Sequence, residues 1–292
     1  MKTAAVIGAN SMLGAQLVSV LSSMGVEVIS VGRYAKADIQ LDLEKGFLAP
    51  LSGNPHADVI FHCAASFADD SREGIRKNFQ VNTAGCLWVL ELAEHLGCDA
   101  IVYAGSVSSL ETLELGKYTS YGFSKAQAEE LLGWGMKRMN RRFCSLRFSQ
   151  IYDTAGTCLH HQPWFGKIIA YASRGLDINM PGSDGVRNFV HLDDAVRMMV
   201  AAGQSAVNGV LDVVHPESLT YREIALVAYS LFAKGGRVII DPNKAAFRPI
   251  NFPDSTRTFS VLGLTPMITI SEGIARIRDQ GTGHAFGPLD VT

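Results

Sequence analysis

The sequence of 292 residues lacks the features that mark several large classes of protein. No run of apolar residues approaches the roughly 18 that a membrane-spanning helix needs, so we expect no association with a membrane. The 26 basic and 28 acidic residues leave a net charge of −2, which gives no electrostatic basis for binding nucleic acid. Internal repeats and low-complexity segments are absent as well.

Cysteine is scarce and scattered. The five cysteines are odd in number and form no CxxC pair and no Cys/His pattern with the spacing of metal ligands. We therefore expect reduced thiols, a cytoplasmic protein and no bound metal ion. The chain does contain 47% hydrophobic and only 18% charged residues, which excludes intrinsic disorder and suffices for a large buried core.

Two kinds of segment alternate along the first half of the chain. Short β-type runs cover residues 4–7, 26–31, 58–63, 100–104 and 144–148, and apolar residues at helical spacing cover 13–24, 82–96 and 124–139. Strands that alternate with helices predict an α/β fold with a parallel sheet and helices on both of its faces.

This pattern changes after about residue 153. Residues 154–187 are richer in Gly, Pro, His and Trp, a strong helix is predicted over 192–202, and short β-type runs such as 211–214 and 237–240 follow. We expect two units: a larger one of residues 1–153 with about 186–210, and a smaller, discontinuous one of about 154–185 with 211–292.

A glycine-containing turn follows the first predicted strand. Gly8 permits a tight turn and Gly14 permits close packing of the next helix, while the N–H groups and dipole of that helix suit a pyrophosphate. The glycine that usually stands between them is missing, and Ser11 takes its place as a small residue that can donate to phosphate. The turn predicts a dinucleotide site formed by Gly8, Asn10, Ser11, Met12, Leu13 and Gly14.

An acidic residue is missing at the end of the second predicted strand. Sites that prefer NAD usually have one there to accept from the ribose 2′-hydroxyl. This chain has Arg33 instead, and its guanidinium can pair with a 2′-phosphate. We therefore predict that NADP(H) is favoured over NAD(H), with Asp42 and Leu43 as candidates for the adenine side of the site.

Tyr121 and Lys125 are four residues apart at the start of a predicted helix and so share one face. A free phenol has a pKa of ~10, which a nearby ammonium group and an oxidised nicotinamide would lower. Tyr121 is then a candidate general acid for a ketone or base for an alcohol, and Lys125 a candidate ligand of the nicotinamide ribose. The hydroxyl of Ser106, which follows a predicted strand, can polarise the reacting oxygen, and Ser108 is the alternative for this role.

Together these motifs resemble the extended short-chain dehydrogenase/reductases, specifically the NAD(P)-dependent epimerase/dehydratase family of nucleotide-sugar enzymes. The resemblance covers nearly the whole chain. It implies a doubly wound parallel sheet of the Rossmann type that binds the dinucleotide, a smaller C-terminal domain for the sugar nucleotide, and a homodimer paired through the helices predicted over 82–96 and 124–139. The motifs that carry it are residues 8–14, 62–65, 82–85, 102–106, 121–129, 146–148, 187–194 and 262–266.

The resemblance also implies roles for individual residues. Ser106, Tyr121 and Lys125 would form the catalytic set. Asn82 would lie near the nicotinamide. The family's Gly-Asp pair is missing after Arg248, one of the residues implied for the substrate. The further cofactor residues are Ala64, Ala65 and Phe148, and the substrate residues are Gln150, as a polar contact, with Arg187 and Arg248, whose guanidinium groups would bind a diphosphate.

One more absence bears on the reaction. Dehydratases of the family carry an Asp-Glu pair directly after the catalytic Ser or Thr, whereas Val107 and two serines follow Ser106. We therefore predict NADPH-dependent reduction of a keto sugar attached to a nucleotide. The principal alternative is an NAD-dependent nucleotide-sugar 4-epimerase, which uses the same residues. Two less favoured functions are that of a reductase of a non-sugar carbonyl and that of a non-catalytic dinucleotide-binding sensor.

Overall fold

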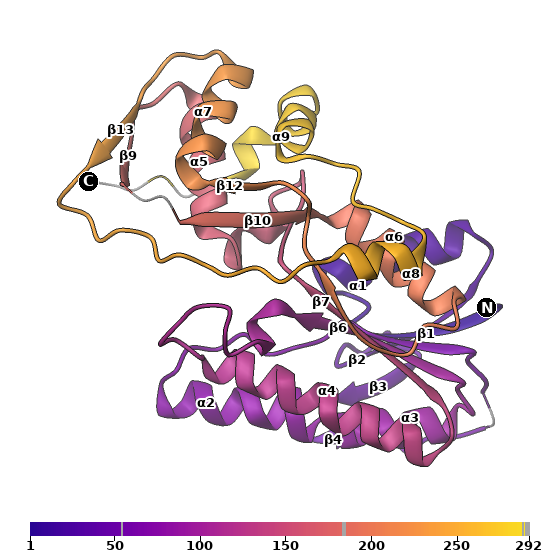
Figure 1. The fold of residues 1–292 in the computed structure, drawn as a ribbon. Helices are drawn as coiled ribbons and strands as arrows, with labels where there is room; N and C mark the ends of the chain where they lie inside the picture. Colours follow the sequence, from indigo (N-terminus) through magenta and orange to yellow (C-terminus); the bar gives the residue numbers. More distant parts are fainter. Residues whose placement is uncertain (54, 183–184, 288, 290–292) are drawn as a thin grey trace. The chain divides into compact units, whose positions relative to one another are not determined.

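The computed structural model describes residues 1–53, 55–182, 185–287 and 289. The chain forms two compact units (Figure 1). In the described part of the chain, no helix is both long enough and apolar enough to cross a membrane. The first unit consists of Met1–Phe148, Ala195–Val213 and Pro253–Leu264, and the second of Ser149–Asp194, Val214–Phe252 and Thr265–Thr292.

An eight-stranded sheet forms the centre of the first unit. The strands are β1 (Thr3–Ile7), β2 (Glu27–Gly32), β3 (Ile39–Asp42), β4 (Gly46–Phe47), β5 (Val59–His62), β6 (Ala100–Ser106), β7 (Arg142–Phe148) and β11 (Gly209–Val213). Their order is β11-β7-β6-β5-β1-β2-β3-β4, and all neighbours are parallel except β3 and β4. The chain builds β1 to β3 in one direction and β5 to β7 in the other, so the doubly wound α/β fold predicted from the sequence is confirmed.

Helices cover both faces of this sheet, α3 and α4 on one face and α1 and α6 on the other (Figure 1). On the first face Ile60 of β5 joins Val89 and Leu132 in the buried core. The next residue of β5, Phe61, points to the opposite face, where its ring lies against Gly203. The helices are α1 (Met12–Ser23), α2 (Arg72–Asn78), α3 (Cys86–His95), α4 (Ser120–Arg138), α6 (Leu192–Gln204) and α8 (Thr256–Leu262).

The helix predicted over residues 82–96 is interrupted. A π-helical turn covers Phe79–Ala84, and α3 begins only after Gly85. A Cβ on Gly85 would lie 2.4 Å from the carbonyl oxygen of Val81 and 2.8 Å from that of Leu43, so the glycine allows a backbone approach that no other residue permits. The helix predicted from 124 starts earlier, at Ser120, which places Tyr121 in its first turn.

In the described residues of the second unit, two small sheets accompany three α-helices. Tyr152, Phe165 and Phe189 stack in its core, with ring centroids 5.0 to 6.0 Å apart. The strands are β8 (Gln150–Tyr152), β10 (Val186–His191) and β12 (Ser218–Thr220) in one sheet and β9 (Ile178–Pro181) with β13 (Val238–Asp241) in the other, and the helices are α5 (Pro163–Arg174), α7 (Tyr221–Phe232) and α9 (Ile270–Asp279).

The division of the chain differs from the expected one at four places. β11, expected mostly in the smaller unit, pairs with β7 from Gly209 opposite Cys144 to Val213 opposite Phe148. The segment Pro253–Leu264 belongs to the first unit as well. Conversely, β8 and β10, expected in the larger unit, pair with each other, and β10 also pairs with β12, so both belong to the second unit. Strand pairing over long sequence separations decides the places of β8, β10 and β11, and local patterns do not report it.

Candidate active site

The turn between β1 and α1 forms a close-packed backbone cradle. Gly8 has a φ of 79°, and a Cβ there would lie 2.9 Å from the backbone nitrogen of Ala64. A Cβ on Gly14 would lie 2.1 Å from the carbonyl oxygen of Gly8. Ser11 is the N-cap of α1, and its Oγ accepts a hydrogen bond of 3.1 Å from the Gly14 N–H. The serine that replaces the usual glycine thus starts the helix and keeps a hydroxyl proton to donate to an anion.

The other members of this turn differ in exposure. Asn10 is exposed, Met12 is half-buried, and Leu13 is buried in the core. The exposed backbone N–H groups at the start of α1 could hold a pyrophosphate, whereas Leu13 contributes packing.

β2 ends in a basic residue. Arg33 directly follows this strand and is exposed. Asp38, which the sequence analysis did not single out, faces the same strand. Its Oδ2 accepts hydrogen bonds from the Ser30 hydroxyl at 2.6 Å and the Ser30 N–H at 2.8 Å, and these bonds lower the pKa of the carboxyl. This carboxylate is therefore engaged by Ser30, and the side chain that directly follows β2 is a cation.

The residues predicted for the adenosine side follow β3 and β5. Asp42 ends β3 and is 9% exposed, and its Oδ1 accepts a hydrogen bond of 2.9 Å from the Glu44 N–H. Leu43 is buried beside it. After β5, Ala64 lies against Gly8 and Ala65 is exposed. All of these positions lie at the carboxyl edge of the sheet, and Ala64 and Ala65 follow β5 at the reversal of strand order between β1 and β5, where ligands of this fold class bind.

Ser106 and Tyr121 are brought together by β6 and α4. Ser106 ends β6, Tyr121 lies in the first turn of α4, and the Ser106 hydroxyl is close enough to the phenol to influence its pKa. The Oγ of Ser106 also accepts a hydrogen bond of 3.2 Å from the backbone N–H of Ser108. Of the two candidate serines, Ser106 thus contacts the tyrosine, whereas Ser108 supports it through the backbone. Phe148, at the end of β7, pairs with Ser106 across the sheet and is buried.

Lys125 lies one turn further along α4 and is only 2% exposed. Its Nζ donates a hydrogen bond of 2.7 Å to the carbonyl oxygen of Ala104 and lies 4.0 Å from the centroid of the Tyr103 ring. Burial lowers the pKa of Lys125 to about 8, and the Glu129 carboxylate acts in the opposite direction. Burial also raises the pKa of Tyr121, while the neighbouring Ser106 hydroxyl acts against it. Burial is the larger of these two influences, so the phenol is protonated near neutral pH; the lowering expected from an ammonium group together with an oxidised nicotinamide stays a prediction.

Two buried asparagines connect α4 with the loop that follows β5. Asn82, expected near the nicotinamide, is 2% exposed and donates to the Ser66 carbonyl oxygen at 2.9 Å and to the Ser124 hydroxyl at 3.0 Å. Asn78, which the sequence analysis missed, donates to the Ser120 hydroxyl at 2.9 Å. Because Ser120 and Ser124 flank Tyr121 on α4, both amides help to fix the position of this helix.

An ion pair between a buried carboxylate and a half-buried guanidinium supports the same helix. Glu129 is 4% exposed and accepts a hydrogen bond of 2.6 Å from Nη2 of Arg147 and one of 2.7 Å from the Ser145 hydroxyl. A Cβ on Gly105 would lie 2.7 Å from the Glu129 carboxylate, which explains the glycine just before Ser106. The sequence signal for Glu129 was its spacing of four residues from Lys125.

The three predicted substrate residues belong to the second unit. Gln150 donates a hydrogen bond of 2.6 Å to the side chain of Gln162, and in the described part of the chain its own Oε1 is buried without a hydrogen-bond partner. Arg248 is exposed, and its carbonyl oxygen accepts a hydrogen bond of 3.0 Å from Nη1 of Arg187.

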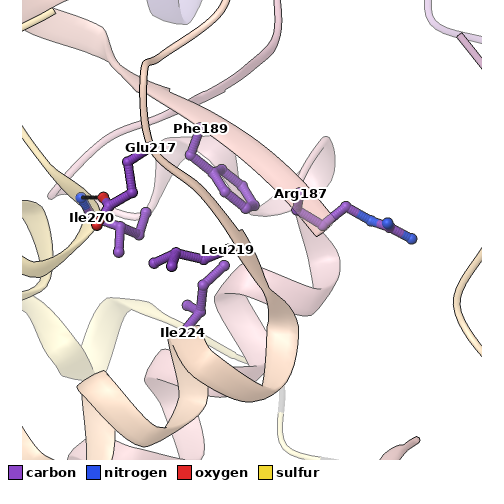
Figure 2. A pocket seen from close by; sticks show the side chains of 6 residues that line it. All are labelled: Arg187, Phe189, Glu217, Leu219, Ile224 and Ile270. Carbon is purple, nitrogen blue, oxygen red and sulfur yellow. Dashed lines mark hydrogen bonds between the residues drawn. The ribbon is translucent and has the colours of Figure 1, made fainter. Parts of the chain in front are cut away.

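The Arg187 side chain is held tightly within this unit. It is 8% exposed, and its guanidinium lies over the rings of Tyr221 and Phe247 at 5.2 and 5.5 Å from their centroids. Figure 2 shows that the guanidinium points away from a small pocket that the side chain borders. The volume of that pocket, about 10 Å³, matches a single water site. Its lining consists of Arg187, Phe189, Glu217, Leu219, Ile224 and Ile270.

Comparison with known protein families identifies the family to which this site belongs. Residues 4–214 match the model of the NAD dependent epimerase/dehydratase family. The chain belongs to this family. It is therefore an NAD(P)-dependent enzyme of a group that epimerises, dehydrates or reduces nucleotide sugars.

Relatives in this epimerase/dehydratase family differ in their reactions. The UDP-glucose 4-epimerase of Lacticaseibacillus casei is 25% identical over 233 residues, which cover 66% of this chain and 69% of that protein. The dTDP-4-dehydro-6-deoxyglucose reductase of Escherichia coli is 23% identical over 232 residues, 75% of this chain and 73% of that protein. The solved structure of RMD from Pseudomonas aeruginosa, complexed with NADPH, covers 98% of both chains with a TM-score of 0.77 at 16% identity, which shows a shared fold.

Proposed function

We propose that the protein is an NADPH-dependent reductase of a keto sugar attached to a nucleotide. The neighbouring side chains of Ser106 and Tyr121, at the carboxyl edge of the sheet, carry this proposal. The segment Val107–Ser109 after Ser106 contains no acid, so the groups that a dehydratase needs at this place are absent. Reduction requires only a hydride and one proton.

The first unit has residues that fit the cofactor. The Gly8–Gly14 cradle at the start of α1 would bind the pyrophosphate, and exposed Arg33 would pair with a 2′-phosphate. The positions predicted along the rest of the cofactor are Asp42, Leu43, Ala64, Ala65, Asn82, Lys125 and Phe148. Solved structures of the same fold contain NADPH in one case and NAD in another, so the choice between the two cofactors rests on Arg33.

NADPH, when bound, supplies the hydride that adds to the carbonyl carbon. Tyr121 is protonated near neutral pH because burial raises its pKa, and it donates this proton to the carbonyl oxygen. Ser106 donates a hydrogen bond to the same oxygen while negative charge develops there. The products are the alcohol and oxidised cofactor, and the phenol regains its proton from solvent.

In this proposal the second unit recognises the nucleotide sugar. Arg187 supplies a buried cation and Arg248 an exposed one for the diphosphate, and Gln150 supplies a polar contact. The reductase of Escherichia coli, whose name specifies a dTDP-linked keto sugar, supports this class of substrate.

The principal competing reaction is epimerisation at C4 with bound NAD. The epimerase of Lacticaseibacillus casei supports it. The cationic end of β2 argues against it, since the carboxylate of Asp38 is engaged by Ser30.

The resemblance to the family also leads us to propose a homodimer. Leu87 of α3 and Trp134 of α4 are 55% and 57% exposed, and such side chains are typical of a helix pair that packs against a second copy. Light scattering at micromolar concentration should give twice the mass of the chain, and a monomer would contradict this part of the proposal.

The proposal is tested by the substitution Tyr121→Phe, with Tyr118→Phe as the matched control. Tyr118 lies just before the same helix, but its hydroxyl donates a hydrogen bond to the Ser109 carbonyl oxygen. We expect Tyr121→Phe to lower kcat for reduction of dTDP-4-keto-6-deoxyglucose by about 10²–10⁴-fold without changing the Kd of NADPH. An unchanged rate would remove Tyr121 as the acid, and retention of tightly bound NAD with no net NADPH consumption would favour the epimerase.

A further inference from the structure

A large apolar side chain lies exposed beside the proposed general acid. Phe67 belongs to the loop after β5 and is 54% exposed. Its ring contacts Tyr121 edge to face, with centroids 4.5 Å apart and planes at 70°. Aromatic rings are usually buried because exposure to water costs free energy. Here, within the first unit, one is presented against the ring of the proposed general acid.

The backbone on both sides of this ring is fixed. The Ser66 N–H donates to Oδ1 of Asn82 at 2.7 Å, and the Ser66 hydroxyl donates to Oδ1 of Asn78 at 3.0 Å. On the other side of Phe67, the Ala68 N–H donates to Oδ1 of Asn78 at 3.0 Å, and its carbonyl oxygen accepts from Nδ2 of Asn78 at 3.1 Å. Asn78 is 0% exposed and Asn82 2%, so these bonds are shielded from water. We call the two asparagines the amide clamp.

The amide clamp reaches α4 as well as the loop. Asn78 bonds the hydroxyl of Ser120 and Asn82 that of Ser124, so the clamp spans Tyr121 on its helix. The Ser120 N–H also donates to Oδ1 of Asp70, later in the same loop, at 2.8 Å. The loop and the first turn of α4 are thereby held as one body. The buried hydrogen bonds of the amide clamp therefore fix the contact between the rings of Phe67 and Tyr121, although Phe67 itself is exposed.

A second exposed phenylalanine, which lies on α4, provides a contrast. Phe123 is 44% exposed and contacts Phe79 and Tyr118, with centroids 5.5 and 5.7 Å away. Neither Phe79 nor Tyr118 is one of the proposed catalytic residues, which are Ser106, Tyr121 and Lys125. Phe123 therefore matches Phe67 in size and exposure but not in its relation to the reacting hydroxyl.

We propose that Phe67 is a specificity-determining residue of the active site, where its ring packs against an apolar substituent next to the reacting carbonyl. This inference rests on the proposed function, because it requires the carbonyl to lie at Tyr121. The chemistry of a phenyl ring selects C–H groups, and a hydroxyl or carboxylate at the same place would lose water without gaining a hydrogen bond. The substrate class is accordingly a deoxy keto sugar on a nucleotide, with a methyl group where other sugars carry a hydroxymethyl or a carboxylate.

The test compares the binding of two sugars that differ by one hydroxyl. The Kd values of dTDP-6-deoxyglucose and dTDP-glucose are measured by calorimetry on the NADP⁺-loaded protein, for the wild type, Phe67→Ala, Phe67→Leu and the control Phe123→Ala. We expect the wild type and Phe123→Ala to bind the deoxy sugar about tenfold more tightly, Phe67→Ala to show a ratio near one, and Phe67→Leu to show an intermediate ratio. The Kd of NADP⁺ should stay within about twofold in all four proteins.

Three results would overturn the inference: a wild type that does not distinguish the two sugars, an unchanged ratio in Phe67→Ala, or an equal loss in Phe67→Ala and Phe123→Ala. A separate measurement, the oxidation of NADPH, tests the proposed function. If the wild type oxidises no NADPH with dTDP-4-keto-6-deoxyglucose, reduction is refuted, while the ratio of the two binding constants still decides the role of Phe67.

Discussion

Replacing Arg33 by alanine should change the cofactor preference while leaving the fold intact. The side chain is exposed and directly follows β2, so its removal leaves no cavity. A hydrogen bond to a charged group contributes about 1.5–3 kcal/mol. Because Arg33 is in contact with solvent, we expect the lower end, about 1.5 kcal/mol, which corresponds to about tenfold in the Kd of NADPH. NADH lacks the 2′-phosphate, and its Kd should change by less than about twofold.

The assay is titration of the protein with NADPH and NADH, followed by the fluorescence of the reduced nicotinamide. Lys36→Ala is the matched control, since it removes an exposed cation from the same loop. Raising the salt concentration should weaken the NADPH preference of the wild type, because exposed charges are screened, and should leave Arg33→Ala almost unaffected. An unchanged ratio of the two affinities in Arg33→Ala, or the same change in Lys36→Ala, would refute the reasoning.

Three further predictions concern the buried parts of the first unit. Glu129→Ala removes the main partner of the half-buried Arg147 guanidinium, which keeps only the Asp212 carboxylate at 3.9 Å, and should lower the free energy of unfolding by about 3 kcal/mol, whereas exposed Glu130→Ala should change it by under about 0.5; equal urea midpoints would contradict this. The pKa of Lys125 is lowered from 10.5 to about 8, so the unfolded chain binds more protons between these values. Stability should therefore rise with pH across that window relative to Lys125→Met, and parallel curves would contradict it. Gly14→Ala places a methyl group 2.1 Å from a carbonyl oxygen and should weaken NADPH binding and lower Tm, whereas Gly133→Ala, with 3.4 Å of clearance, should not; equal Tm values would count against the cradle.

The parts of the fold that the sequence predicted depend on short-range patterns. The Gly8–Gly14 turn, the alternation of strands and helices, and the Tyr121–Lys125 pair are each defined within a few residues. The contact between Ser106 and Tyr121 follows from topology, because parallel strands end at one edge of the sheet, where the following helices begin.

The features that escaped prediction depend on partners far away in the chain. Asn78 works with Ser120, 42 residues later, and a π-helical turn aligns it with Asn82, which an ordinary helical pattern would not suggest. The place of β11 in the large sheet depends on its pairing with β7. Phe67 resembles any loop phenylalanine until its contact with the Tyr121 ring is known.

The most direct test of the central claim follows one deuterium atom. The protein is incubated with NADPH carrying deuterium at C4 of the nicotinamide and with dTDP-4-keto-6-deoxyglucose, and the sugar product is examined by mass spectrometry and NMR. We predict one deuterium on the former carbonyl carbon for each NADPH consumed, and loss of this transfer in Tyr121→Phe. Epimerised nucleotide sugar without deuterium and without net consumption of NADPH would contradict it.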